Sequence, residues 1–297
     1  MTKEMRPPRC RRTWLFLPGA ERDRLRDAAA SGADVLIQEL EDFTPPERRA
    51  EARALTAETL RLWRAAGAVA TVRINPLDGC GLDDLDAVIP ARPDAVLLAM
   101  TNAPDEVRAL DAELTRRERA LGLPEGDIEI VPNIETARAL VSAGAIAAAS
   151  PRVAAMLLAT EDLAADLDAE RTREGRELDY ARRRFLVECV AANVVAIDCP
   201  WTFGDAAGAE ADARFSRSLG YAAKSLVAPA HAAPVNRALT PSREEAERAA
   251  RLVAAFEAAR AEGRERAEVD GLLVEVPTYR AARRLIARRD ELARYEV

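Results

Sequence analysis

Histidine and lysine are scarce in this sequence. His231 is its one histidine, and Lys3 and Lys224 are its two lysines, so arginine supplies almost all of the 43 basic residues. A metal site built from several histidines is therefore excluded. A histidine-based catalytic triad would have to use His231. A Schiff-base aldolase would have to use Lys224, because Lys3 lies in a terminal segment that we expect to fray. Carboxylates and arginines remain as the main groups for chemistry.

Cysteines and long apolar runs are scarce as well. The four cysteines, at positions 10, 80, 189 and 199, show neither CxxC nor Cys/His ligand spacing, so we expect neither a disulfide framework nor a zinc site. The apolar run from Trp14 to Leu17 is far too short for a signal peptide or a membrane span. A net charge of −7 argues against a general nucleic-acid surface. We therefore expect a cytoplasmic protein that binds neither membranes nor nucleic acids.

Eight short apolar runs, rich in β-branched residues, predict strands. They alternate with stretches of helical periodicity at the roughly 30-residue spacing of a βα unit. Runs that are apolar on both faces fit parallel strands covered by helices, so we expect a (β/α)₈ TIM barrel over residues 1–240 rather than an open sheet. The expected strands are 13–17, 34–40, 68–74, 94–99, 128–132, 153–159, 193–198 and 223–228, and the expected helices are 21–31, 46–66, 104–121, 136–149, 174–191 and 207–219.

Residues 241–297 are predicted to form a C-terminal helical extension. A long amphipathic helix reaches about residue 262, a short EVDGLLVEVP segment follows, and an Arg-rich helix comes last. No linker rich in Gly, Ser or Pro sets this region apart, so we expect it to pack on the barrel or on a neighbouring subunit. Capping-box spacing at Ser242 to Glu245, and at Thr44 to Glu47 in the barrel, predicts a helix start at each place.

Charged side chains follow several of the expected strands. The carboxyl ends of parallel barrel strands share one mouth, so these side chains would meet there. Any one acid could serve only as a helix N-cap or first-turn residue, as Asp162 is placed to do, and Arg73 could form a purely structural pair with Glu41. Several acids around one opening would repel one another unless a cation lies among them. The residues are Glu39, Glu41, Asp42, Arg73, Glu135, Glu161, Asp162 and Asp198.

Oxygen ligands without a histidine cluster favour Mg²⁺ (or Mn²⁺), which completes its octahedron with water and substrate. Such an ion would polarise a carbonyl and hold an α-keto carboxylate by chelation. A nearby arginine suits bidentate carboxylate binding or the stabilisation of an enolate. The residues therefore indicate a metal-assisted reaction of a small keto acid.

Seven segments of the chain follow one another in the order of motifs from a known family. They are RRTWLFLPGAERDRL, GADVLIQELEDFTPPERRAEAR, VRINPLDG, IETARAL, TEDLAADLD, AIDCPWT and LTPSREEAERA. Together they resemble the citrate lyase β-subunit and malyl-CoA lyase family of Mg²⁺-dependent (β/α)₈ barrel lyases, over nearly the whole chain. Each match is weak alone, whereas seven collinear matches are a specific signal.

The resemblance implies roles for residues at the expected mouth. Glu135 and Asp162 would be the Mg²⁺ ligands. Arg73 would bind the keto-acid carboxylate and support the developing enolate. Glu41 would help to organise the metal-bound waters and Arg73.

The resemblance also implies a reaction, which is the cleavage or formation of a C–C bond between an acyl-CoA and a small α-keto acid. Citryl-, malyl- or citramalyl-CoA would be the substrate type, with a carrier-bound acyl group as a variant. Arg12 and Asp198 would contribute to substrate binding. Glu275, from the C-terminal segment of a neighbouring subunit, would be the general acid that protonates the enolate. The resemblance implies a homo-oligomer, either a trimer or a hexamer.

Several positions depart from the family pattern. Met100 replaces a lysine after the fourth strand, and Ala228 replaces a histidine after the eighth. Ala159 replaces a glycine, and Glu39 and Glu275 each replace an aspartate. Displacing a carboxyl group by one methylene matters at a reacting centre. We infer that the metal and keto-acid half is retained and that the pocket for the acyl donor or the carbonyl is remodelled.

Three readings of the function remain at this stage. The first is the Mg²⁺-dependent lyase or aldolase. The second is a thioester hydrolase, in which a metal-bound 3-hydroxyacyl-CoA loses CoA to water. The third is a barrel without turnover that serves as a binding or scaffold subunit. The lost lysine and histidine favour the third, whereas the intact Arg73, Glu135 and Asp162 count against it.

Overall fold

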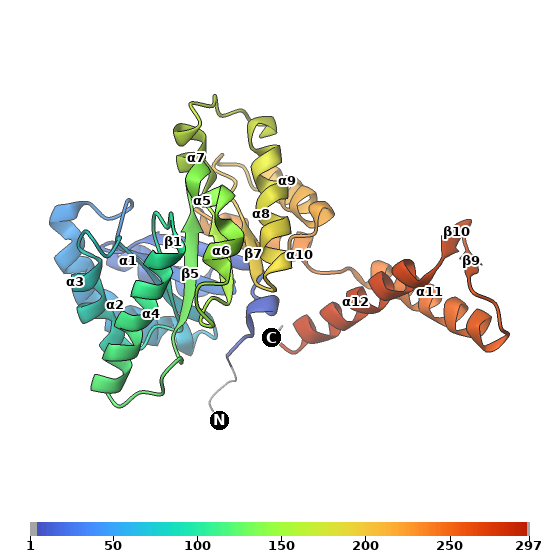
Figure 1. Cartoon of the computed structure of the whole chain (residues 1–297), viewed down its shortest axis with the longest axis horizontal. Helices are drawn as coiled ribbons and strands as arrows, with labels where there is room; N and C mark the ends of the chain where they lie inside the picture. Colours follow the sequence, from blue (N-terminus) through green and yellow to red (C-terminus); the bar gives the residue numbers. More distant parts are fainter. Residues whose placement is uncertain (1–4, 296–297) are drawn as a thin grey trace. The chain divides into compact units, whose positions relative to one another are not determined.

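Eight parallel strands close into a barrel in the first of two units, which divide between Arg237 and Ala238 (Figure 1). The computed structural model describes residues 5–295. The strands neighbour one another in sequence order, and β1 pairs with β8 to close the barrel, which confirms the predicted (β/α)₈ fold. The strands are β1 (Thr13–Pro18), β2 (Val35–Glu39), β3 (Val69–Ile74), β4 (Ala95–Leu98), β5 (Glu129–Ile134), β6 (Ala155–Leu158), β7 (Val195–Asp198) and β8 (Ala223–Leu226).

Helices surround these strands, and some were not expected from the sequence. The helix expected over 136–149 is interrupted at Ser142, and α3, α7 and α10 are short helices that the periodicity did not single out. The first ten are α1 (Arg22–Asp27), α2 (Arg49–Ala65), α3 (Gly81–Val88), α4 (Pro104–Ala120), α5 (Ala137–Val141), α6 (Ala143–Ala147), α7 (Thr160–Asp166), α8 (Asp179–Ala191), α9 (Ala206–Leu219) and α10 (Ala232–Leu239). None of the helices within residues 5–295 combines the length and apolarity needed to cross a membrane.

Alternation along each strand separates the barrel interior from the helix layer. Successive side chains point to opposite faces of a strand. One buried apolar cluster takes every second residue, such as Val35 and Ile37 in β2 or Ala155 and Leu157 in β6. Following the same alternation, Arg73 shares the inner face of β3 with Val69. The interior is thus mainly a packed apolar core, as is usual for this barrel, and Arg73 lies at the end of β3 that opens at the mouth.

The two predicted capping boxes have different outcomes. Ser242 and Glu245 form the complete box at the start of α11 (Arg243–Ala261). The box predicted at Thr44 is wrong, because the Thr44 hydroxyl accepts from the Gly19 backbone N–H and donates to the Glu39 carbonyl instead. The helix α2 begins only after a 3-10 turn, η3 (Pro46–Arg48). Thr44 therefore ties the end of β1 to the end of β2.

The second unit holds α11, a short hairpin and α12 (Val276–Ala293). The EVDGLLVEVP segment forms the antiparallel strands β9 (Ala267–Val269) and β10 (Leu272–Val274). Asp270 and Gly271 both have positive φ at the turn, as a two-residue type I′ hairpin requires. Phe256 and Tyr279 stack between the two helices at 4.8 Å.

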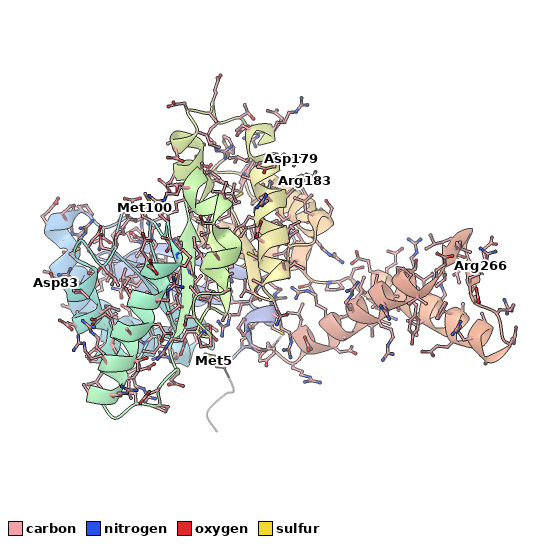
Figure 2. All side chains as sticks on the ribbon, viewed as in Figure 1. Met5, Asp83, Met100, Asp179, Arg183 and Arg266 are labelled. Atoms are coloured by element: carbon pink, nitrogen blue, oxygen red, sulfur yellow. The ribbon has the colours of Figure 1, made fainter. Side chains whose placement is uncertain are left out.

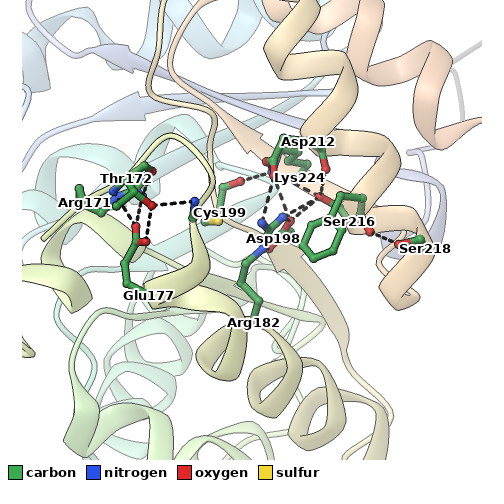
Figure 3. Close-up of polar contacts among 12 residues, drawn as sticks. Arg171, Thr172, Glu177, Arg182, Asp198, Cys199, Asp212, Ser216, Ser218 and Lys224 are labelled. Atoms are coloured by element: carbon green, nitrogen blue, oxygen red, sulfur yellow. Dashed lines mark hydrogen bonds and ion pairs between the residues drawn. The ribbon is translucent and has the colours of Figure 1, made fainter. Parts of the chain in front are cut away.

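A buried ion cluster lies between the barrel and its helices beside β7 and β8 (Figure 3). The Asp198 carboxylate accepts from Arg182 Nη2 at 2.5 Å, from Lys224 Nζ at 3.2 Å and from the Ser216 hydroxyl at 2.5 Å. Lys224 Nζ also lies 2.5 Å from Asp212. Burial alone would raise the pKa of Asp198, but Lys224 and Arg182 outweigh it and hold that pKa well below its usual value. The one described lysine is therefore a paired structural ammonium.

Lys224→Met is expected to lower the free energy of unfolding by about 3–5 kcal/mol, because it leaves a fully buried Asp198 with one cation instead of two. Urea unfolding followed by circular dichroism measures this. Arg183→Met is the control, because Arg183 forms an exposed pair with Asp179 on α8 (Figure 2). Such a pair contributes under about 1 kcal/mol. Equal stability of the two variants would contradict the account of the cluster.

Candidate active site

A cavity of about 290 Å³ opens at the carboxyl ends of the strands. Its charged lining consists of Arg73 from β3, Asp42 from the loop after β2, and Glu161 and Asp162 from α7. The rest is mainly apolar, with hydroxyl groups from Thr160, Thr202 and Ser225 as the exceptions. Both barrel geometry and this residue set make the cavity the candidate active site.

Arg73 is at the centre of the site and is enclosed by carboxylates. Its Nε donates to Glu39 at 2.9 Å, its Nη2 lies 2.8 Å from Glu41, and its Nη1 lies 3.7 Å from Glu135. Glu39 and Arg73 are direct neighbours in the β2–β3 register. The Arg73 side chain is 6% exposed, so the cation and its partners are held away from bulk water. The longest of the three contacts, to Glu135, is the one most easily given up.

Two of these carboxyl groups have strongly altered pKa values. Burial raises the pKa of Glu41 to about 8 against the pull of Arg73, and the adjacent Asp42 carboxyl adds to the increase. Burial likewise raises the pKa of Glu135 to about 7, opposed by Arg73 and assisted by Asp162. One arginine thus does not neutralise the site. A divalent cation would restore the charged form of both groups.

Polar atoms without partners gather where β5 and β6 end. Among the described residues, no hydrogen-bond partner meets Glu135 Oε1, either amide atom of the Asn133 side chain, or the Thr160 hydroxyl. All three residues are at most 1% exposed. Buried polar atoms without partners are rare and costly, so such a cluster is expected where a ligand or ion binds. The orphaned carboxylate oxygen of Glu135 fits a metal ligand.

The donor set suits one class of metal. Within the part of the chain that is described, no group of three or more His, Cys, Asp or Glu residues is arranged to hold an ion. A site that relied on protein ligands alone, as structural zinc sites do, is therefore not supported. Mg²⁺ commonly binds through one or two carboxylates and keeps water or substrate oxygens for its other positions. Glu135 and Asp162 meet that requirement.

Asp162 reaches the cavity from the first turn of α7 and is not its N-cap. The N-cap position belongs to Ala159, so the interpretation of Asp162 as an N-cap is wrong. Partial burial and the nearby Asp42 raise the pKa of Asp162. Its neighbour Glu161 also lines the cavity but pairs with Arg171 at 2.9 Å. Two carboxylates of α7 line the cavity, and of these Glu161 is paired with an arginine whereas Asp162 is not.

The structure does not support the pocket role expected for Arg12. Arg12 precedes the first residue of β1 and therefore lies at the amino-terminal end of the barrel, opposite the mouth. There its guanidinium donates to Asp34 through Nε at 2.9 Å and Nη2 at 3.1 Å. The expectation is wrong because Arg12 precedes β1, whereas the residues that follow the parallel strands reach the mouth.

The substrate-binding role expected for Asp198 is also wrong. Ile197 belongs to the inner cluster, so the next residue, Asp198, points outward to the helix layer. Its carboxylate is fully occupied by the ion cluster with Arg182 and Lys224. Glu275 is exposed at the N-cap of α12 in the second unit, and its role as a general acid stays a prediction.

Sequence reasoning missed the two aromatic residues beside Arg73. Phe16 and Phe43 lie against its guanidinium, with ring centroids 5.2 and 5.9 Å from Cζ. Glu39 accepts at 2.6 Å from the backbone N–H of both Glu41 and Phe43, and so shapes the loop that carries them. Alternation from Trp14 would have placed Phe16 inside the barrel, but the loop fold around Glu39 left no sequence signal.

Comparisons with known proteins agree with this geometry. Residues 12–229 match the HpcH/HpaI aldolase/citrate lyase family profile. The citrate lyase subunit beta of Leuconostoc mesenteroides subsp. cremoris is 31% identical, over 95% of this chain and 94% of that protein. A (3S)-malyl-CoA thioesterase of Cereibacter sphaeroides (strain ATCC 17029 / ATH 2.4.9) is also 31% identical, over 96% of each.

A solved structure extends the agreement to the fold. The CitE protein of Mycobacterium tuberculosis, in complex with magnesium, acetoacetate and coenzyme A, is 27% identical with a TM-score of 0.76. The alignment covers 94% of this chain and 98% of that one. The chain therefore belongs to the HpcH/HpaI aldolase/citrate lyase family, whose relatives named here include both a lyase subunit and a thioesterase.

Proposed function

We propose that this protein is a Mg²⁺-dependent C–C lyase or aldolase that cleaves or forms a 3-hydroxyacyl thioester from an acyl-CoA and a small α-keto acid. The observation that carries the proposal is the pairing of an orphaned, buried Glu135 with Asp162 beside the enclosed cation Arg73. A magnesium complex of a relative with coenzyme A and acetoacetate adds support. Citryl-, malyl- and citramalyl-CoA represent the substrate type.

Glu135 and Asp162 would hold the Mg²⁺ ion, with Mn²⁺ as a substitute. When bound, the ion would polarise the keto carbonyl and accept the keto and carboxylate oxygens as ligands. Glu135 would then turn from Arg73 to the ion, which frees Arg73 Nη1 for the keto-acid carboxylate and for the oxygen of the developing enolate. Glu41 would keep Nη2 of Arg73 in position.

The acyl-CoA enolate that leaves on cleavage needs a proton at its carbon. We propose that Glu275 donates it from a neighbouring subunit of a trimer or hexamer. Glu275 is exposed and makes no side-chain capping bond to α12, so its carboxyl group is available for such a role. The acyl group could equally be carried by CoA or by a carrier protein.

Thioester hydrolysis is the second candidate, and the (3S)-malyl-CoA thioesterase relative favours it. The same carboxylates and Arg73 would bind the hydroxyacyl group, and water would attack the thioester carbonyl to release the thiol. A scaffold without turnover fits less well. It would gain nothing from an orphaned buried carboxylate, which costs folding free energy.

Glu135→Gln and Asp162→Asn are each expected to weaken Mg²⁺ binding at least about 100-fold, because loss of a metal ligand exceeds the roughly 10- to 100-fold loss seen for outer partners. Isothermal titration calorimetry with pyruvate present measures the affinity. Glu161→Gln is the control, because it removes one negative charge beside Asp162 in the cavity lining, but from a residue paired with Arg171. Equal losses in Glu161→Gln and Glu135→Gln would contradict the assigned ligands.

Incubation with citryl-, malyl- or citramalyl-CoA should release one keto acid for each acyl-CoA formed, without free thiol. A hydrazone assay measures the keto acid, and a thiol reagent measures CoA. Asp162→Asn should abolish the keto-acid signal. Thiol release from malyl-CoA without any keto acid would overturn the lyase assignment in favour of the hydrolase.

A further inference from the structure

Much of the wall of the candidate active-site cavity is apolar. Six residues form this apolar wall, namely Phe16, Phe43, Leu157, Ala159, Pro200 and Val227. They come from the ends of strands β1, β2, β6, β7 and β8 or from the loops that follow. A keto acid chelated beside Asp162 and Arg73 would therefore have its substituent within the same cavity of about 290 Å³. Burying the carbon atoms of a substituent against this apolar wall would favour binding, because apolar surface is removed from water.

Positive charge for a second carboxylate is missing from this cavity. Among the described residues that line it, Arg73 is the only cation, and the other charged groups are the acids Asp42, Glu161 and Asp162. The Arg73 guanidinium lies beside the rings of Phe16 and Phe43, and its N–H groups face three carboxylates. If Glu135 binds the metal as proposed above, Nη1 of Arg73 would lose its 3.7 Å contact with Glu135. That N–H group would then bind the first carboxylate of the substrate.

The neighbouring arginines on the rim are already engaged. Arg171 pairs with Glu161 at 2.9 Å and with Glu177 at 2.5 Å. The guanidinium of Arg173 lies 5.0 Å from the ring centroids of both Trp201 and Phe203, and it pairs with Asp205 as well. A second substrate carboxylate would thus meet acids, hydrocarbon and the neutral hydroxyl groups of Thr160, Thr202 and Ser225, but no further cation. Burying a charge without a cation is costly.

We propose that the keto-acid partner of this enzyme is a monocarboxylate with an apolar substituent, and that keto acids with a second carboxylate are excluded. This inference rests on the proposed function, because it assumes that a keto acid binds beside the metal. The apolar wall favours binding of an apolar substituent, and the absence of an available cation disfavours binding of a second carboxylate. The substrate class of the proposed function is narrowed accordingly: thioesters of the citramalyl-CoA type, which release a keto acid with a hydrocarbon group, are retained. Citryl-CoA, which releases the dicarboxylate oxaloacetate, is excluded.

Matched pairs of keto acids test the proposal. 2-Oxobutyrate and oxaloacetate differ only by a terminal methyl against a terminal carboxylate, as do 2-oxopentanoate and 2-oxoglutarate. Calorimetry of the full chain with saturating Mg²⁺ should show the methyl member of each pair binding at least about tenfold tighter, which corresponds to about 1.4 kcal/mol. Equal or tighter binding of the dicarboxylates would overturn the inference and leave the proposed function intact. No binding of any keto acid would overturn both.

A charge placed on the apolar wall gives a second test. Val227→Lys should strengthen oxaloacetate binding and weaken 2-oxobutyrate binding, each by at least about tenfold, because it supplies the missing cation at the cost of wall area. Met100→Lys is the matched control, because Met100 lines a separate cavity with Pro76 and Leu77. It should leave the preference unchanged. If Met100→Lys alone reverses the preference, the discriminating wall is not the one assigned here.

Discussion

The buried guanidinium of Arg73 is the constraint on which the rest of the site depends. It brings together Glu39 and Glu41 at the end of β2 and Glu135 after β5, which are distant in the sequence. A cation held away from water is tolerated only when carboxylates surround it, and removing one partner of such a pair is strongly destabilising. Three carboxylates around one arginine nevertheless leave negative charge in excess, as the raised pKa values of Glu41 and Glu135 reflect. The network that holds the barrel mouth together therefore carries an excess negative charge, which a divalent cation would neutralise.

The barrel itself was largely predictable, because parallel strands that are buried on both faces consist of apolar runs, and here these runs recur at regular spacing. All eight expected strands are present, and the mouth positions of Arg73, Glu135 and Asp162 follow from strand order. Short helices such as α3 were missed because eight residues carry little periodicity. The hairpin at Asp270 and Gly271 was missed although the sequence carries a signal for it, because an Asp-Gly pair between apolar residues favours a two-residue turn.

The errors at the site have one physical origin, which is that a list of strand ends ignores direction and alternation. Asp198 ends β7 as Arg73 nearly ends β3, yet the two side chains leave the barrel wall on opposite faces. Arg12 adjoins β1, but at the end where the chain enters the barrel. Glu275 belongs to a separate unit, so no reading of barrel alternation could place it. The position of Phe43 depends on a loop in which the backbone N–H groups of Glu41 and Phe43 donate to the Glu39 carboxylate. No local sequence motif predicts this loop conformation.

The central claim is that Glu135 and Asp162 bind a divalent ion together with a keto acid. Crystals of the full chain soaked with Mn²⁺ and pyruvate, with data collected at the manganese edge, test it most directly. The account predicts an anomalous peak bonded to one oxygen of Glu135 and one of Asp162, with pyruvate chelating the same ion beside Arg73. Ordered pyruvate at the mouth without an ion at these carboxylates, or an ion bound only elsewhere, would contradict it.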